Sequence, residues 1–155
     1  LAAAKGWAEA FSKPAIGVSV LEAVAAQATT PAPLLASVVD ARRGQLYGAL
    51  YERRNGQIVR CGDEMVLTPE ELFAWLAERP GGKSMALVSP APETFQAALA
   101  RSPLCDASVE RVSPFLAAMI GLLAYRRAVG GEAHDAIGLD ANYVRRSDAE
   151  VKWKD

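Results

Sequence analysis

The stretch VVDARRGQLYGALYERRNGQ, residues 38–57, joins the end of an apolar strand to a short turn and a second strand. Its first part continues an apolar run from residue 34, LLASVVDA, and such near-continuous runs are typical of strands covered on both faces. In its second part, successive side chains would point to opposite faces of a strand, and Tyr47 and Tyr51 would share one of these faces. The stretch therefore predicts two antiparallel strands around the turn at 40–44.

Asn55–Gly56 is the strongest short turn signal in the chain. It predicts that residues 57–67 pair back as a third antiparallel strand, with Gly62 marking a bulge. Thr68 and Glu71 then form a capping-box pattern that opens a helix.

The rest of the chain alternates strands and helices. Strands are predicted at 85–89 and 107–112, a helix at 92–102, and a last helix that begins with Ser113 as its cap and ends at the glycines 130–131.

Before residue 34 the pattern reads helix, strand, helix. Residues 1–12 predict a helix, 14–19 a buried strand, and 21–28 a helix opened by Ser19 as its cap. The proline-containing segment 28–34 predicts a boundary or hinge. The first helix starts without a methionine or a capping residue, so we expect the sequence to be the later part of a longer protein.

Three antiparallel strands followed by alternating helices and parallel strands predict an α/β fold, a mixed sheet with helices on both faces. This order resembles the ribonuclease-H-like half-domain of actin-like ATPases. We expect residues 1–30 to be the tail of a truncated first copy, residues 34–131 to be one complete copy, and residues 132–155 to be a C-terminal tail that docks back on the protein.

Composition excludes several classes of protein. The 155 residues suffice for one domain, or for one domain with a fragment of another. The formal net charge of −1 gives no basic excess for a dedicated nucleic-acid module. Cys61 and Cys105 make no disulfide framework, which favours a reducing cytoplasm, and no run of eighteen apolar residues predicts a membrane span.

Metal and nucleophile chemistry has little support. The single histidine, His134, and two distant cysteines do not provide the ligands of a standard zinc site, so we expect no metal. Neither glycine-rich phosphate fingerprint occurs.

The turn at 40–44 is the candidate nucleotide-binding hairpin. In actin-like folds a glycine-containing hairpin contacts phosphate, and Asp40, Arg42, Arg43 and Gly44 occupy the matching positions. Bulky arginines would keep a phosphate away from the backbone amides, although their guanidinium groups would attract one. The alternative, which we favour, is that Asp40 accepts turn amides and the arginines are solvated.

Three segments together resemble the TsaB (YeaZ) family of glycoprotease-like proteins. They are KGWAEAFSKPAIGVSVLEAVA (5–25), VVDARRGQLYGALYE (38–52) and ANYVRRSDAEVKWK (141–154). The resemblance implies a cytoplasmic, non-catalytic subunit that helps make threonylcarbamoyladenosine in tRNA by pairing with and activating a TsaD-type transferase. It also implies a TsaE-type ATPase as a third partner. By the same resemblance, ATP and tRNA would bind only to the assembled complex, and this chain would bind no cofactor itself.

Members of this family pair through helices of the first domain. By resemblance, residues 1–12 would supply partner contacts through Lys5, Trp7, Ala8 and Phe11, with a homodimer forming when the partner is absent. Two alternatives remain open: an actin-like phosphotransferase using Asp40 and Gly44, and a peptidase, which the residue set disfavours.

Overall fold

The computed structural model describes residues 1–79 and 81–132. The chain divides into two compact units, unit 1 (Leu1–Val18 and Ile120–Asp155) and unit 2 (Ser19–Met119).

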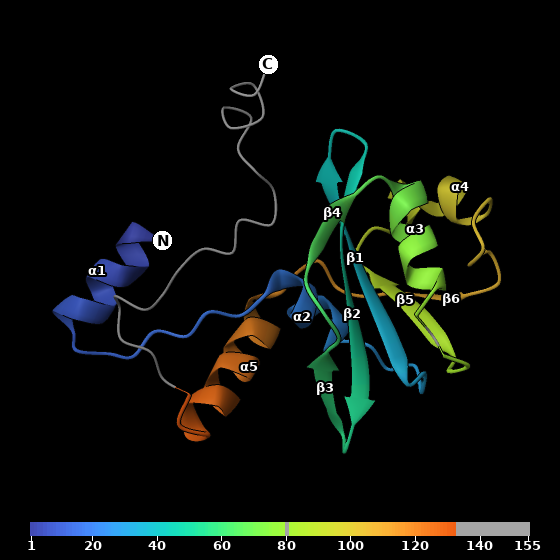
Figure 1. Cartoon of the computed structure of the whole chain (residues 1–155). Helices are drawn as coiled ribbons and strands as arrows, with labels where there is room; N and C mark the ends of the chain where they lie inside the picture. The colour runs from blue at the N-terminus through green and yellow to red at the C-terminus, as the bar shows by residue number, and fades with distance from the viewer. Residues whose placement is uncertain (80, 133–155) are drawn as a thin grey trace. The chain divides into compact units, whose positions relative to one another are not determined.

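Unit 2 is built on a mixed sheet, as the sequence predicts. In the described residues the six strands follow the order β3-β2-β1-β5-β6, with β4 beside β2 (Figure 1). β2 runs antiparallel to β1, whereas β5 and β6 run parallel to β1. The strands are β1 (Leu34–Arg42), β2 (Gln45–Arg54), β3 (Gln57–Arg60), β4 (Met65–Leu67), β5 (Met85–Ser89) and β6 (Ser108–Arg111).

The two predicted hairpins are confirmed. β1 and β2 pair from Leu34 opposite Glu52 to Arg42 opposite Gln45, and β2 and β3 meet at Arg54 opposite Gln57. Asn55 and Gly56 have φ angles of 51° and 78°, the left-handed values that a primed two-residue turn requires.

The third antiparallel strand is split, which corrects the prediction of one continuous strand. Arg60 pairs with Tyr51 and Met65 with Gly48, so the four residues 61–64 lie opposite only two residues of β2. The Cys61 amide still donates to the Leu50 carbonyl at 2.7 Å, and the regular pairing is interrupted after it. Gly62 lies inside this interruption with φ at 88°. The predicted irregularity at Gly62 is correct, but it breaks the strand instead of bending it.

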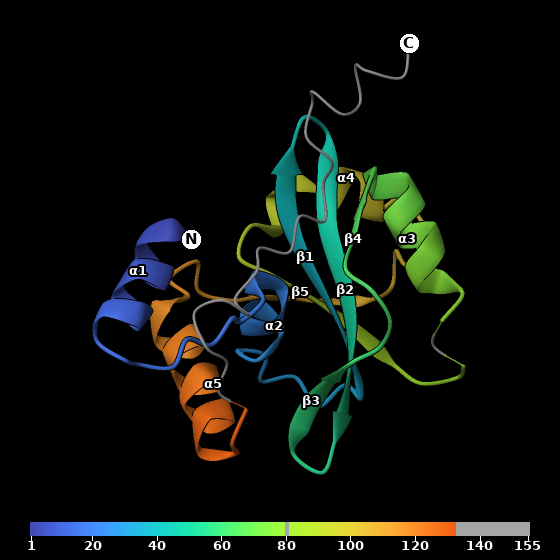
Figure 2. The ribbon, with the colours of Figure 1, turned by 60° about the vertical axis from the view of Figure 1, so that its left-hand side comes forward.

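Helices cover both faces of the sheet in unit 2, as predicted. α3 (Pro69–Ala77) and α4 (Gln96–Leu99) pack on one face, and α2 (Val20–Ala25) packs on the other (Figure 2). The α3 face contains Leu46 and Leu50 of β2, and the α2 face contains Ala49 and Tyr51. The period-two alternation read from β2 is therefore correct.

The start of α3 is the best-predicted local feature. The Thr68 hydroxyl accepts the Glu71 amide while the Glu71 carboxylate accepts the Thr68 amide, completing the capping box. This helix sits directly on β2 at Gly48, where a Cβ atom would lie 2.5 Å from Leu72 Cδ1. Only glycine admits so close an approach without displacing Leu72.

Three predicted elements differ from the structure. Residues 14–19 form no strand, and Ala15 makes only an isolated bridge. The helix expected at 92–102 is reduced to a 3₁₀ turn, η1 (Pro92–Thr94), and the four-residue α4. The last helix, α5 (Ala117–Val129), begins later than the predicted Ser113 cap.

Each difference has a tertiary or local cause. A strand needs a neighbour to pair with, and residues 14–19 join no ladder in the part of the sheet that is described. Phe95 has φ at −131° and turns inward against Phe73, their ring centroids 5.8 Å apart, which breaks the helix. The Ser113 hydroxyl accepts the Phe115 amide in a local turn instead of capping a helix.

Unit 1 contributes α1 (Ala2–Ala10) and most of α5. α1 ends where expected, with Ser12 at φ 50° just before Lys13 and Pro14. None of the helices within the described ranges has both the length and the hydrophobicity to cross a membrane.

Candidate functional site

The candidate site is the β1–β2 hairpin, whose tip has an unusual backbone. Arg42, Arg43 and Gly44 have consecutive positive φ angles of 62°, 54° and 73°. Arg43 and Gly44 are the central turn residues between the paired Arg42 and Gln45, and the register shifts between Asp40 and Arg42. Left-handed backbone costs a non-glycine residue about 1 kcal/mol or more, so two arginines here are energetically unfavourable.

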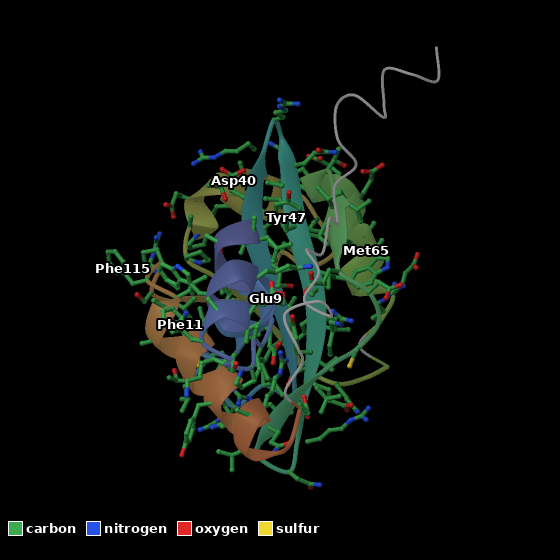
Figure 3. The ribbon with its side chains drawn as sticks, turned by 90° about the vertical axis from the view of Figure 1, so that its left-hand side faces the viewer. Glu9, Phe11, Asp40, Tyr47, Met65 and Phe115 are labelled. Atoms are coloured by element: carbon green, nitrogen blue, oxygen red, sulfur yellow. The ribbon has the colours of Figure 1, made fainter. Side chains whose placement is uncertain are left out.

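Asp40 supports this turn with its side chain (Figure 3). Its Oδ1 accepts the Arg42 amide at 2.7 Å, and its Oδ2 lies 3.4 Å from Arg42 Nη1. The Asp40 side chain is 28% exposed and that of Arg42 is 87% exposed. The carboxylate therefore accepts a turn amide, which is the arrangement that the sequence favoured over phosphate binding.

The hairpin does not fit a nucleotide phosphate held by backbone amides. Such a loop presents free amides and small residues to the anion. Here the Arg42 amide donates to Asp40, and exposed arginine side chains occupy the two positions before Gly44.

The structure gives no metal centre in its described residues, where no group of three or more His, Cys, Asp or Glu side chains could hold an ion. His134 lies outside the described residues, as does the predicted docking tail from residue 133 onward. Cys61 and Cys105 are free thiols.

The four predicted partner-contact residues of α1 face different ways. Trp7 and Phe11, one helical turn apart, are 73% and 70% exposed, whereas Ala8 is buried and Lys5 is half-buried. Trp7 of α1 and the C-cap residue Phe11 are thus exposed, whereas Ala8 is buried. Large apolar side chains that are this exposed mark a candidate contact surface.

Sequence reasoning missed a carboxylate clamp on the proline-containing segment. Glu110 on β6 accepts the amides of Thr29 and Thr30 at 2.8 and 2.9 Å, and the Thr29 hydroxyl at 2.8 Å. Although partial burial opposes ionisation, these hydrogen bonds hold the pKa of Glu110 below its usual range.

A second contact fixes the same segment, because Arg53 Nη2 donates to the Ala28 carbonyl at 2.7 Å. The segment predicted as a hinge is therefore anchored to two strands. Nothing local in the sequence signals these contacts, since Thr29 and Glu110 lie 81 residues apart.

Comparisons with known proteins point to one family. The family described as "TsaD: tRNA N6-adenosine threonylcarbamoyltransferase" matches residues 1–110. A crystal structure described as an uncharacterized protein with similarity to peptidase YEAZ from Pseudomonas aeruginosa matches with a TM-score of 0.71 and 23% identity, over 93% of this chain. YeaZ from Pseudomonas aeruginosa matches over 91% of this chain, also at 0.71 and 23%.

The two matched proteins are longer than this chain. This chain spans 65% and 64% of those two proteins. No curated protein matches the sequence.

Proposed function

The chain belongs to the tRNA N6-adenosine threonylcarbamoyltransferase (TsaD) family, and on that basis we propose that it acts in forming threonylcarbamoyladenosine in tRNA. Its role is that of a non-catalytic subunit that pairs with and activates a TsaD-type transferase. A TsaE-type ATPase joins this assembly in the cytoplasm. ATP and tRNA then bind to the complex and not to this chain alone. Alone, the chain forms a homodimer.

The geometry of the hairpin carries the non-catalytic part of this proposal. The Asp40 carboxylate accepts the amide of Arg42 and pairs with its guanidinium, which favours a role in the turn over a role in holding a metal–nucleotide pair. The TsaB-like fold supports the comparison with an activating partner in place of a transferase.

The partner-pairing part rests on α1. Trp7 on α1 and Phe11, the residue that caps its C-terminus, expose two large aromatic side chains four residues apart. Tryptophan is among the residues enriched at interface hot spots. We propose that this surface, with Lys5 at its margin, contacts the transferase. Ala8 supports the helix from its buried side.

Co-purification with a TsaD-type transferase tests the pairing. The double variant Trp7→Ser/Phe11→Ser is expected to weaken the complex by about 2 kcal/mol or more, roughly thirtyfold, with an unchanged melting temperature. Phe115→Ser is the matched control, because Phe115 is 86% exposed and lies on another segment.

Equal capture of the wild type and the double variant would contradict the assignment of α1. A wild-type chain that forms homodimers and never binds the transferase would contradict the pairing itself.

Calorimetric titration with ATP separates this function from an actin-like phosphotransferase. We expect no tight binding to the chain alone. Tight binding that Asp40→Ala abolishes would favour the phosphotransferase, whose phosphate contacts would be Asp40, Arg42, Arg43 and Gly44. Peptide hydrolysis by the pure chain would favour the peptidase.

A further inference from the structure

α5 carries apolar residues on all sides, yet none of its residues is buried. Of its thirteen residues only Arg126 and Arg127 are charged. One side, which includes Ile120 and Leu123, is half-buried, and the opposite side is exposed. Because a helix that is apolar all round is normally enclosed, the exposed side is a candidate contact surface.

The exposed side of α5 is a continuous stripe. Leu122, Tyr125 and Val129 follow one another at three- and four-residue spacing and are 42%, 67% and 70% exposed. Gly121 and Ala128 lie beside them and are exposed as well, and a Cβ atom at Gly121 would meet no atom within 4 Å. These five residues are called the α5 stripe below. It offers large side chains with gaps between them.

A second stripe of the same kind lies at α1, the other helix of unit 1. Ala4, Trp7 and Phe11 follow one another at the same three- and four-residue spacing, and all three are exposed, Trp7 by 73% and Phe11 by 70%. They are called the α1 stripe below. Neither stripe contains a charged residue, and both mix large and small side chains, so the large side chains of one can fill the gaps of the other.

The area of the two stripes favours a second copy of the chain as their cover. A stable interface buries about 800 Å² on each partner, and an enclosed aromatic side chain buries about 150–250 Å². At their exposed fractions, Trp7, Phe11 and Tyr125 together offer roughly 300–500 Å² per copy, to which Leu122 and Val129 add. Either stripe alone falls well short of a stable interface. A second copy presents both stripes and can cover both at once.

We propose that the homodimer forms by reciprocal contacts, in which the α1 stripe of each copy packs on the α5 stripe of the other. The inference rests on the homodimer of the proposed function and adds the surface that forms it. A twofold axis closes such an exchange, because each copy then uses each stripe once. The α1 stripe also contains the proposed contact with the transferase, so the α5 stripe is the part that serves the homodimer alone.

Analytical ultracentrifugation of the full chain measures the dimer. Leu122→Gln/Tyr125→Gln removes two large apolar side chains from the α5 stripe, and glutamine is a good helix former. We expect the Kd of the dimer to rise roughly thirtyfold or more, with an unchanged melting temperature and unchanged capture by the transferase. Val59→Gln/Val109→Gln is the matched control, because these valines of unit 2 are 39% and 40% exposed, and it should leave the Kd unchanged.

Cross-linking tests which helices meet. In a chain with Cys61→Ser and Cys105→Ser, one sample carries Ala10→Cys on α1 and another carries Ala128→Cys on α5, both at exposed positions. A bismaleimide should link the two samples when they are mixed and should link neither sample to itself. Hydrogen exchange of α1 and α5 should also slow as the concentration of the wild-type chain rises, and not in Leu122→Gln/Tyr125→Gln.

Several results would overturn the inference. An unchanged Kd in the glutamine variant of α5, or an equal rise in the valine control, would show that the α5 stripe is not the contact. Cross-links within the Ala10→Cys sample alone, or within the Ala128→Cys sample alone, would show that like helices meet. A monomeric wild type would remove the homodimer together with the inference. None of these results bears on pairing with the transferase, which the capture experiment measures separately.

Discussion

Asp40 lies two residues before the end of β1, and both of its carboxylate oxygens contact Arg42, the last residue of that strand. The amide hydrogen bond to Arg42 at 2.7 Å fixes the entry to the turn, while the ion pair at 3.4 Å lies on an exposed guanidinium. Exposed ion pairs contribute little to stability, whereas a hydrogen bond that fixes a strained backbone contributes more. The amide contact should therefore be the more important of the two.

Substitution of Asp40 separates these contributions. Asp40→Asn keeps an oxygen that accepts the Arg42 amide, and we expect it to cost less than about 0.5 kcal/mol in free energy of unfolding. Asp40→Ala removes the acceptor and should cost about 0.5–1.5 kcal/mol. Urea denaturation measures both, and an equal loss in the two variants would assign the stabilisation to the ion pair.

At this scale the sequence predicted chemistry better than conformation. An acid before a turn is a familiar amide acceptor, so the role of Asp40 could be read directly. The positive φ of Arg42 and Arg43 could not, because arginine carries no signal for left-handed backbone and only the strand register reveals it.

Among elements, the contact between α3 and β2 depends on one missing side chain. Leu72 is fully buried, and its side chain occupies the space where a Cβ of Gly48 would lie. The Leu72 side chain of the helix therefore fills the space that a side chain at position 48 would take.

Gly48→Ala should destabilise unit 2 by about 1–3 kcal/mol, the usual cost of overpacking a well-filled core. Combining it with Leu72→Ala should cost less than the sum of the single changes, because the two sites share one space. Gly121→Ala is the control, since a Cβ there meets no atom within 4 Å. Additive losses in denaturant midpoints would show that Gly48 is needed for another reason.

The Glu110 clamp predicts a specific dependence on acid. Its pKa is lower in the folded chain than in the unfolded one, so ionised Glu110 stabilises the fold above its unfolded-state pKa of about 4.3. That stabilisation is lost as the pH falls through the lower, folded-state pKa. Glu110→Gln should flatten the stability curve below about pH 4.3, as measured by urea midpoints at several pH values.

An unchanged slope in Glu110→Gln would mean that other carboxylates dominate acid unfolding. Glu71 is the natural comparison, because hydrogen bonds from the amide and hydroxyl of Thr68 also lower its pKa.

Elements with complete local signals were predicted, and elements that depend on distant partners were not. The capping box at Thr68 and the turn at Asn55–Gly56 carry their own hydrogen bonds and were correct. The helix at 92–102 failed because Phe95 packs on Phe73. The strand at 14–19 failed because, among the residues that the structure describes, this segment makes only the bridge at Ala15 and joins no ladder. Neither requirement is visible in a window of sequence.

For the molecule as a whole, burial is distributed unequally between the two units. Both clusters of buried apolar side chains, one on each face of the sheet, lie within unit 2. Among the described residues of unit 1, Ala8 is the only buried one, and α5 has no buried residue along its length. A helix of this length gains most of its stability from packing.

Hydrogen exchange should therefore resolve the two units. We expect the amides of β1, β2 and β5 to exchange only on global unfolding, and those of α1 and α5 to exchange through local opening at much lower free energy. Mass spectrometry of peptides from each element measures this. If α5 exchanged as slowly as β1, some contact would have to cover it.

The order of strands and helices in unit 2 was predictable because the sequence of each element indicates its type. Short connections also join consecutive elements, which limits the possible arrangements. The division at residues 18–19 and 119–120 was not, because it depends on which elements share contacts and not on any composition boundary.

The interruption between β3 and β4 has a bearing on how the protein behaves at high concentration. Those two strands form one outer border of the sheet, and a long, regular border would recruit strands from neighbouring molecules. The irregular residues 61–64 divide this edge into strands of four and three residues. Such short strands are poor templates for pairing with a strand of another molecule. The break that spoils the ladder thus also discourages aggregation.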